Sequence, residues 1–266
     1  MSPPLSLLPG LERAWDVELA GLRHGWRRLV KREFADPGEA AALRAEGLYV
    51  ASAPGAYGHA DQSAEVKRGA GSAHTCFYAR DAPTLAEALE LEARASRAAG
   101  AERREAERAL GLLLGYPTCC VAAHTLATDQ GEDACFGRLL GSGQTPPPPA
   151  VNNLFVLSHQ LISHFPCRLD CPTSQALGER ALETLHASDP THAAALAELL
   201  AAPIVVWDRF RFVIEHPEHG PVIAEQLTHA PRLLAHPPYQ AFRASLPQRP
   251  PGGTRLAFAP LAHPFG

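Results

Sequence analysis

Apolar residues recur at helical spacing along much of the chain, and in a few short stretches they alternate with polar residues instead. One face of a helix returns about every 3.6 residues and one face of a strand every second residue, so the two spacings separate the two kinds of element. The helical spacing predicts helices over residues 11–34, 37–46, 83–99, 101–114, 117–126, 151–166, 172–185 and 190–200. A further helix is expected near residues 221–236.

β-branched and aromatic residues mark the expected strands. We expect strands over residues 48–52 and 74–79, which can pair with each other, one or two more over residues 204–214, and a last one over residues 254–259. Residues 53–71 are rich in glycine, alanine, serine and charged residues and predict a long loop. These elements predict an α+β fold, mainly helical in its central region, with small β elements in the N- and C-terminal parts.

The domain organisation expected from these elements is a single domain over residues 1–266. It has an N-terminal α/β part (residues 1–100), a helical, cysteine-bearing core (residues 101–202) and a C-terminal part with β elements (residues 203–266). Residues 146–149 are four consecutive prolines, which favour a stiff, extended spacer. The segment around these prolines is the best candidate for a hinge or lid.

Prolines mark the beginnings of several expected helices, because proline suits the first helical turn. Pro83 begins one of them, and Thr84 and Glu87 have the spacing of a capping box there. Pro117 and Pro172 begin two others. These last two helix starts carry most of the cysteines in the chain.

Four of the six cysteines lie in two short segments, GYPTCC at residues 115–120 and HFPCRLDCP at residues 164–172. The four are Cys119, Cys120, Cys167 and Cys171. The first two should fall in the first turn of a helix, where backbone amides and the helix dipole favour a thiolate. Cys171 should be the N-cap of the helix that Pro172 begins. The remaining two, Cys76 and Cys135, are expected to pack in the core.

Composition and charge restrict the partners and the cellular compartment that we expect for this protein. The net charge of −4 offers no basic field for a nucleic acid. The N-terminus lacks the pattern of a secretory signal, and no segment approaches the roughly 18 apolar residues of a membrane span. We therefore expect a cytoplasmic protein with neither nucleic acid nor membrane as a partner. In a reducing compartment, paired cysteines indicate metal ligands or redox thiols more than disulfides.

Four thiolates are enough to hold a tetrahedral ion or an iron–sulfur cluster. Adjacent residues on a helix diverge by about 100°, so Cys119 and Cys120 are not expected to converge readily on one ion, whereas a cluster is wider. Cys171 and Pro172 match the end of the C-x3-C-P run of bacterial ferredoxins, although the C-x2-C-x2-C that should precede it is absent. The sequence favours an iron–sulfur cluster, 4Fe-4S in type, over zinc.

The leading hypothesis from the sequence is an iron–sulfur or other thiolate-metal protein with redox or sulfur chemistry. It would be an oxidoreductase or lyase that acts on a small molecule or peptide and exchanges electrons with a partner protein. His124, four residues after Cys120, and His164 are the candidate catalytic residues. One alternative is a cofactor-free thiol or disulfide enzyme with one of these histidines as base. The other is a non-catalytic binding protein with structural zinc or packed cysteines.

The run from Leu114 to Val121, followed by the run from His164 to Cys171, resembles a prokaryotic family of unknown function marked by a GYPxCC segment and a later HxPCxxxC segment. The resemblance covers roughly residues 70–190. It implies that the four cysteines act as one unit, and it implies no particular activity.

Overall fold

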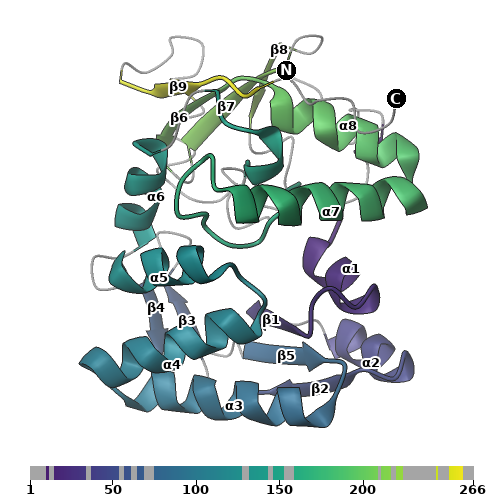
Figure 1. Ribbon diagram of the computed structural model, residues 1–266, viewed down its shortest axis with the longest axis vertical. Coiled ribbons are helices and arrows are strands. Elements are labelled where there is room, and N and C mark those ends of the chain that lie inside the picture. Colours follow the sequence, from purple (N-terminus) through teal and green to yellow (C-terminus); the bar gives the residue numbers. More distant parts are fainter. Residues whose placement is uncertain are drawn as a thin grey trace. The chain divides into compact units, whose positions relative to one another are not determined.

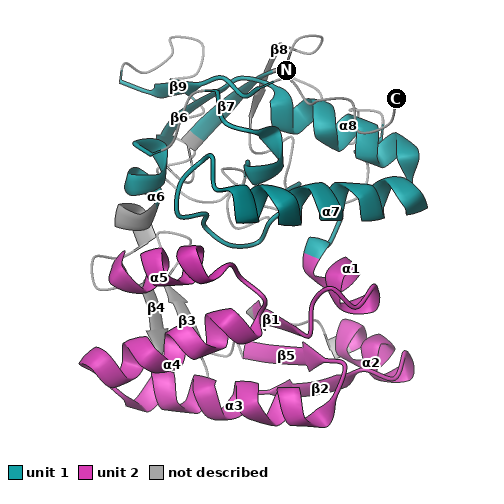
Figure 2. Ribbon diagram, viewed as in Figure 1, with its two compact units in different colours: residues 1–17, 130–266 teal, residues 18–129 magenta. Residues whose placement is uncertain are grey.

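The structure, a computed structural model, describes residues 10–11, 15–33, 37–53, 57–60, 65–68, 75–127, 132–142, 146–152, 159–208, 211–216, 220–223, 244 and 252–259. These residues form helices and small antiparallel sheets, which confirms the predicted α+β fold (Figure 1). The chain divides into two compact units, residues 18–129 and residues 1–17 with 130–266 (Figure 2). The single domain expected from the sequence stays a prediction.

A three-stranded antiparallel sheet lies in the unit of residues 18–129. Its order is β1 (Leu29–Glu33), β5 (Thr75–Ala79) and β2 (Tyr49–Ser52), so the two N-terminal strands expected from the sequence do pair. The central strand β5 is buried along its whole length. Because successive side chains of a strand alternate, Phe77 and Tyr78 fill opposite faces of the sheet.

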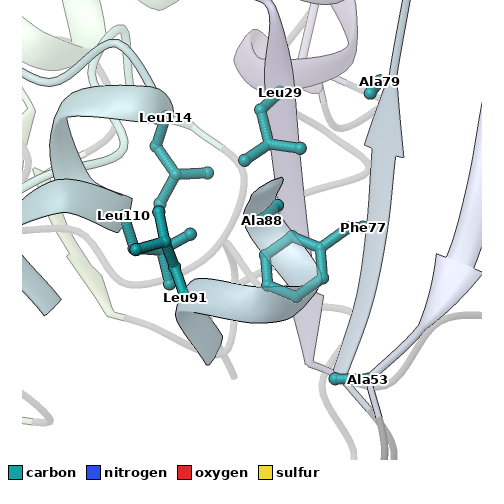
Figure 3. Close-up of a cluster of buried hydrophobic side chains, with 8 residues drawn as sticks. All are labelled: Leu29, Ala53, Phe77, Ala79, Ala88, Leu91, Leu110 and Leu114. Atoms are coloured by element: carbon teal, nitrogen blue, oxygen red, sulfur yellow. The ribbon is translucent and has the colours of Figure 1, made fainter. Parts of the chain in front are cut away.

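The face of the sheet that carries Phe77 packs against α3 (Ala82–Arg97) and α4 (Gly100–Leu113). Leucines of the α3–α4 region gather around the phenyl ring there (Figure 3). The buried members of this cluster are Leu29, Ala53, Phe77, Ala79, Ala88, Leu91, Leu110 and Leu114. Burying a side chain of leucine size contributes about 1.5–3 kcal/mol, so this cluster anchors α4 and the turn that follows it.

The opposite face of the sheet packs against α1 (Val17–Arg23) and α2 (Pro37–Ala45). Tyr78 lies at the centre of this second cluster, and its hydroxyl donates a hydrogen bond of 3.1 Å to Glu39. Cys76 belongs to the same cluster and is 8% exposed, which confirms the prediction that it packs in the core.

The N-cap of α3 differs from the capping box expected at Thr84 and Glu87. Asp81 is the N-cap, and its Oδ1 accepts a hydrogen bond of 2.7 Å from the Thr84 amide. The backbone of Asp81 is extended, with φ −142 and ψ 152, which points its carboxylate at the third amide of the helix.

The single helix expected over residues 11–34 is wrong. α1 ends at Arg23, Gly25 adopts a positive φ of 77, and residues 29–33 form strand β1. Leu29 and Val30 are both fully buried because they pack on opposite faces of the sheet. In the sequence, these two apolar residues follow the preceding helix at helical spacing, so the pattern predicted that the helix continues through them.

The long loop expected over residues 53–71 is wrong in part. Strands β3 (Tyr57–Ala60) and β4 (Glu65–Arg68) pair there as an antiparallel ladder. Backbone hydrogen bonds hold such a ladder, so a polar composition does not forbid it.

In the second unit, two helices pack against each other and against a short 3-10 turn. These elements are α7 (Pro172–Ser188), α8 (Pro190–Ala201) and η3 (Pro149–Val151), and α6 (Glu132–Leu140) precedes them in the chain. Gly178 of α7 allows the close approach of η3, because a Cβ atom at this position would collide with the carbonyl oxygen of Ala150.

The second unit also contains a four-stranded antiparallel sheet of order β8-β7-β6-β9. Its strands are β6 (Ile204–Asp208), β7 (Arg211–His216), β8 (Gly220–Ile223) and β9 (Thr254–Leu256). The segment expected as one or two strands over residues 204–214 therefore forms two. Where a helix was expected near residues 221–236, residues 221–223 belong to β8, and the rest lies outside the described residues.

The helix expected over residues 151–166 is also wrong. Residues 149–151 form η3, residues 153–158 lie outside the described residues, and residues 159–166 form bends and irregular structure. The buried Asn152 amide donates a hydrogen bond of 2.8 Å to the Leu200 carbonyl, which ties the chain to α8 instead of extending a helix.

The proline segment is held within its own unit. The Pro147 carbonyl accepts a hydrogen bond of 2.8 Å from Ala259, and Pro149 is buried in η3. A lid role for this segment stays a prediction. In the described part of the chain, no helix is long and apolar enough to cross a bilayer.

Candidate metal centre

The turn after α4 leads directly into the first cysteine pair. Gly115 adopts a positive φ of 80, which favours glycine, and its amide donates to the Leu112 carbonyl at 3.0 Å. The next amide, that of Tyr116, donates to Gly111 at 3.1 Å, so the last carbonyls of α4 are satisfied as the chain turns. Pro117 then precedes α5 (Thr118–Ala127).

Cys119 and Cys120 lie in the first turn of α5, as the position of Pro117 predicted. The Pro117 carbonyl accepts hydrogen bonds of 2.9 Å from both Cys120 and Val121, which starts the helix at this point. Cys119 is exposed, whereas Cys120 is 1% exposed.

The sulfurs of these adjacent cysteines lie 3.8 Å apart. The sequence had favoured divergence, because neighbouring Cα–Cβ bonds on a helix point about 100° apart. Rotation about χ1 moves each sulfur away from its Cα–Cβ direction, and here the two sulfurs turn toward each other. Adjacent position along the helix therefore does not prevent these two thiols from sharing one ion.

The second cysteine pair lies in the turn before α7. Cys171 is the N-cap residue of α7, as predicted from Pro172, and it is 1% exposed. Its amide donates to the Arg168 carbonyl at 3.1 Å, and its carbonyl accepts from Gln175 at 2.9 Å. Cys167, four residues earlier, is half-buried.

Side chains fix the shape of this second turn. His164 Nε2 lies 2.9 Å from the hydroxyl of Ser174, and both residues are buried, so this bond closes the loop that holds Cys167 and Cys171. Within the same turn, Arg168 Nε lies 3.0 Å from Asp170 Oδ1. A buried polar pair and an ion pair therefore both hold this turn.

The four sulfurs of Cys119, Cys120, Cys167 and Cys171 all lie within 4.8 Å of one another. A tetrahedral ion with metal–sulfur bonds of about 2.3 Å holds its sulfurs about 3.8 Å apart. The donor set consists of soft thiolates, which suit zinc and iron. The four cysteines could therefore hold a metal.

The candidate catalytic histidines lie outside this group. His124 is exposed on α5, and His164 is the buried partner of Ser174. Among the described residues, the ligand group contains cysteines alone. The catalytic roles of both histidines stay predictions, and the side chain of Cys135, in α6, lies outside the described residues.

A buried charged cluster holds the first cysteine turn, and the sequence had not indicated it. Arg27 is 4% exposed; its Nη1 donates to the Leu114 carbonyl at 2.8 Å, and its guanidinium lies 5.3 Å from the Tyr116 ring centre. Glu18 Oε1 accepts a hydrogen bond of 3.3 Å from the Tyr116 hydroxyl. The other oxygen of Glu18 accepts from Arg32 at 2.8 Å. Arg27 and Glu18 thus hold the two residues that flank Gly115, namely Leu114 and Tyr116.

No family model, curated protein or solved structure matches this chain. What the fold and the site define is a class: an α+β protein in which four cysteines could bind a metal.

Proposed function

We propose that this protein binds one zinc ion through Cys119, Cys120, Cys167 and Cys171. The observation that carries the proposal is the grouping of all four sulfurs within 4.8 Å, with the adjacent pair at 3.8 Å. The adjacent pair has the spacing of the edge of a tetrahedron around one ion, about 3.8 Å, and no pair exceeds that edge by more than about 1 Å.

The iron–sulfur cluster favoured by the sequence is the second candidate for this site. Each cysteine of a 4Fe-4S cluster binds a different iron, so its sulfurs are spread farther apart than the sulfurs around a single ion. The donor set and the ferredoxin-like ending at Cys171 and Pro172 support it, but the close spacing of the sulfurs favours one ion.

The proposed role of the zinc is to stabilise the cysteine segments. Catalytic zinc sites keep one coordination position for water or substrate, whereas sites with four protein ligands are typically structural. Four thiolates complete the coordination of the ion and leave no position for a substrate. An enzymatic role, as an oxidoreductase or lyase on a small molecule or peptide, would require a cluster in this site or the departure of one cysteine.

Metal analysis of the purified protein tests this proposal. The full chain is purified without oxygen, and zinc, iron, acid-labile sulfide and the visible spectrum are measured together. We expect one zinc per chain and no visible colour. Brown protein with iron and sulfide would overturn the zinc proposal in favour of a cluster, and metal-free protein would overturn both.

Substitution of single cysteines tests the ligand assignment. Replacing a residue that only supports a metal ligand typically lowers metal affinity by about 10–100-fold. Cys171→Ser removes a ligand itself, so it should lower the zinc affinity by at least about 100-fold. Cys76→Ala is the matched control, because Cys76 is buried in a core cluster apart from this group. Equal zinc binding by the two variants would contradict the assignment.

A further inference from the structure

The four cysteines differ sharply in their access to solvent. Cys119 is exposed and Cys167 is half-buried, while Cys120 and Cys171 are each 1% exposed. Of the four cysteines, Cys119 is therefore the residue most accessible to a dissolved reagent. Cys119 lies in the first turn of α5, and three other cysteine sulfurs lie within 4.8 Å of its sulfur.

We propose that Cys119 is a site of reversible oxidation by peroxide, and that its oxidation releases the metal. This inference rests on the proposed zinc site. Three observations carry it: the exposure of Cys119, the burial of Cys120 and Cys171, and the presence of three other sulfurs within 4.8 Å. Redox-sensitive cysteines are commonly accessible to solvent and lie beside a second cysteine that can form a disulfide with them.

The first step is attack of the Cys119 sulfur on hydrogen peroxide. A sulfur–oxygen bond forms, the oxygen–oxygen bond breaks, and the departing hydroxide leaves as water once it is protonated. The product at Cys119 is a sulfenic acid. Its sulfur is no longer a thiolate, so it binds zinc poorly.

The second step is attack by a neighbouring thiolate on the sulfur of the sulfenic acid. A disulfide forms, the sulfur–oxygen bond breaks, and hydroxide again leaves as water after protonation. In total, two thiolates lose two electrons and one peroxide becomes two waters. The zinc loses two of its four ligands and passes to any chelator in solution.

Cys167 is the thiolate assigned to this second step. The Cα atoms of adjacent residues are about 3.8 Å apart, below the 4.4 Å at which ordinary disulfides begin, so Cys120 is a poor partner for Cys119. Of the other two, Cys171 is 1% exposed and caps α7, whereas Cys167 is half-buried in the preceding turn. Cys167 is therefore the more accessible of these two thiols.

Peroxide titration of the zinc-loaded full chain tests the proposal, with a chromogenic zinc chelator as the reporter. We expect one zinc released per disulfide formed, and rebinding after treatment with dithiothreitol. Because the other sulfurs are less accessible, Cys119→Ser should slow release by about tenfold or more. Cys76→Ala, which removes a cysteine outside the site, should release zinc like the wild type.

A measurement without substitutions covers the case in which Cys119→Ser binds zinc too weakly to test. The zinc-loaded wild type is treated with limiting iodoacetamide, and the labelled cysteines are located by mass spectrometry. Cys119 should be labelled first and Cys120 and Cys171 last. After peroxide, the same mapping should find a disulfide between Cys119 and Cys167.

The outcomes separate this inference from the proposed function. Protein without zinc contradicts the zinc site itself. Protein with one zinc that peroxide does not release, or that labels first at a cysteine other than Cys119, keeps the zinc site and overturns the redox role of Cys119.

Discussion

At the scale of single residues, some groups of the candidate metal site can be predicted from the sequence and others cannot. Cysteine pairs beside helix-starting prolines could be recognised directly, and the structure brings all four sulfurs together. Arg27 could not be recognised, because in sequence it belongs to a run of basic residues typical of a solvated surface. Its burial depends on Leu114 and Tyr116, almost 90 residues away along the chain.

Substitution of Arg27 tests how strongly the first cysteine turn depends on this buried charge. Arg27→Met leaves the Leu114 carbonyl without this donor and removes one of the two guanidinium groups near the buried Glu18. Arg32 still pairs with Glu18 in this variant, so the main loss is the buried hydrogen bond from a charged donor to the Leu114 carbonyl. We expect a decrease of about 1.5–3 kcal/mol in the free energy of unfolding measured with urea. Arg27→Lys, which keeps the charge, should lose less.

The matched control is Arg23→Met, which removes an exposed ion pair with Glu46. Such pairs contribute about 1 kcal/mol or less. If Arg27 positions the cysteines, Arg27→Met should also weaken zinc binding by the folded chain by about 10–100-fold, whereas Arg23→Met should not. An unchanged zinc affinity in Arg27→Met would mean that Arg27 stabilises the fold but does not position the cysteines.

At the scale of elements, the sequence predicted best those helices whose starts carry a local mark. α3, α5, α7 and α8 begin at or beside prolines, and the structure places them within a few residues of the expected bounds. The helix over residues 11–34 was wrong because apolar spacing alone does not reveal the positive φ of Gly25. The ladder of β3 and β4 was missed because backbone pairing gives little sign in a polar segment.

The position of the first cysteine pair depends on the turn at Gly115. Nothing lies within 4 Å of a Cβ atom at this position, so a substitution meets no clash but must adopt a φ of 80. Gly115→Ala should therefore destabilise the protein by about 1–2 kcal/mol. Gly137→Ala in α6 is the control: it has equal space and no positive φ, and it should stabilise by about 0.5–1 kcal/mol. Thermal or urea unfolding that shows the same sign for both would contradict the backbone account.

The cap of α3 gives the protein a dependence on acid pH. Hydrogen bonds from the backbone amide and side chain of Thr84 hold the pKa of Asp81 below its ordinary value. A carboxyl whose pKa is lower in the folded state contributes stability above its unfolded pKa of about 3.9, and this contribution is lost as the pH falls through the folded value. The wild type should therefore lose more thermal stability than Asp81→Asn between about pH 5 and pH 3. Equal losses in the two proteins would contradict this assignment of the cap.

At the scale of the whole molecule, a ligand that binds only the folded chain must raise its stability. Zinc at 100 times its dissociation constant adds about 2.7 kcal/mol, which for a chain of this size corresponds to a Tm increase of about 5–10 °C. Thermal scans of the chelator-treated full chain, with and without added zinc, should show this shift. The shift should be absent in Cys171→Ser. An equal shift in that variant would mean that zinc stabilises the protein from another place.

The central claim, one zinc ion held by four thiolates, is tested most directly by X-ray absorption at the zinc edge of the purified full chain. We predict four sulfur neighbours at about 2.3 Å and no nearby second metal. A shell that contains nitrogen or oxygen, or an iron site with a metal neighbour at short distance, would contradict it.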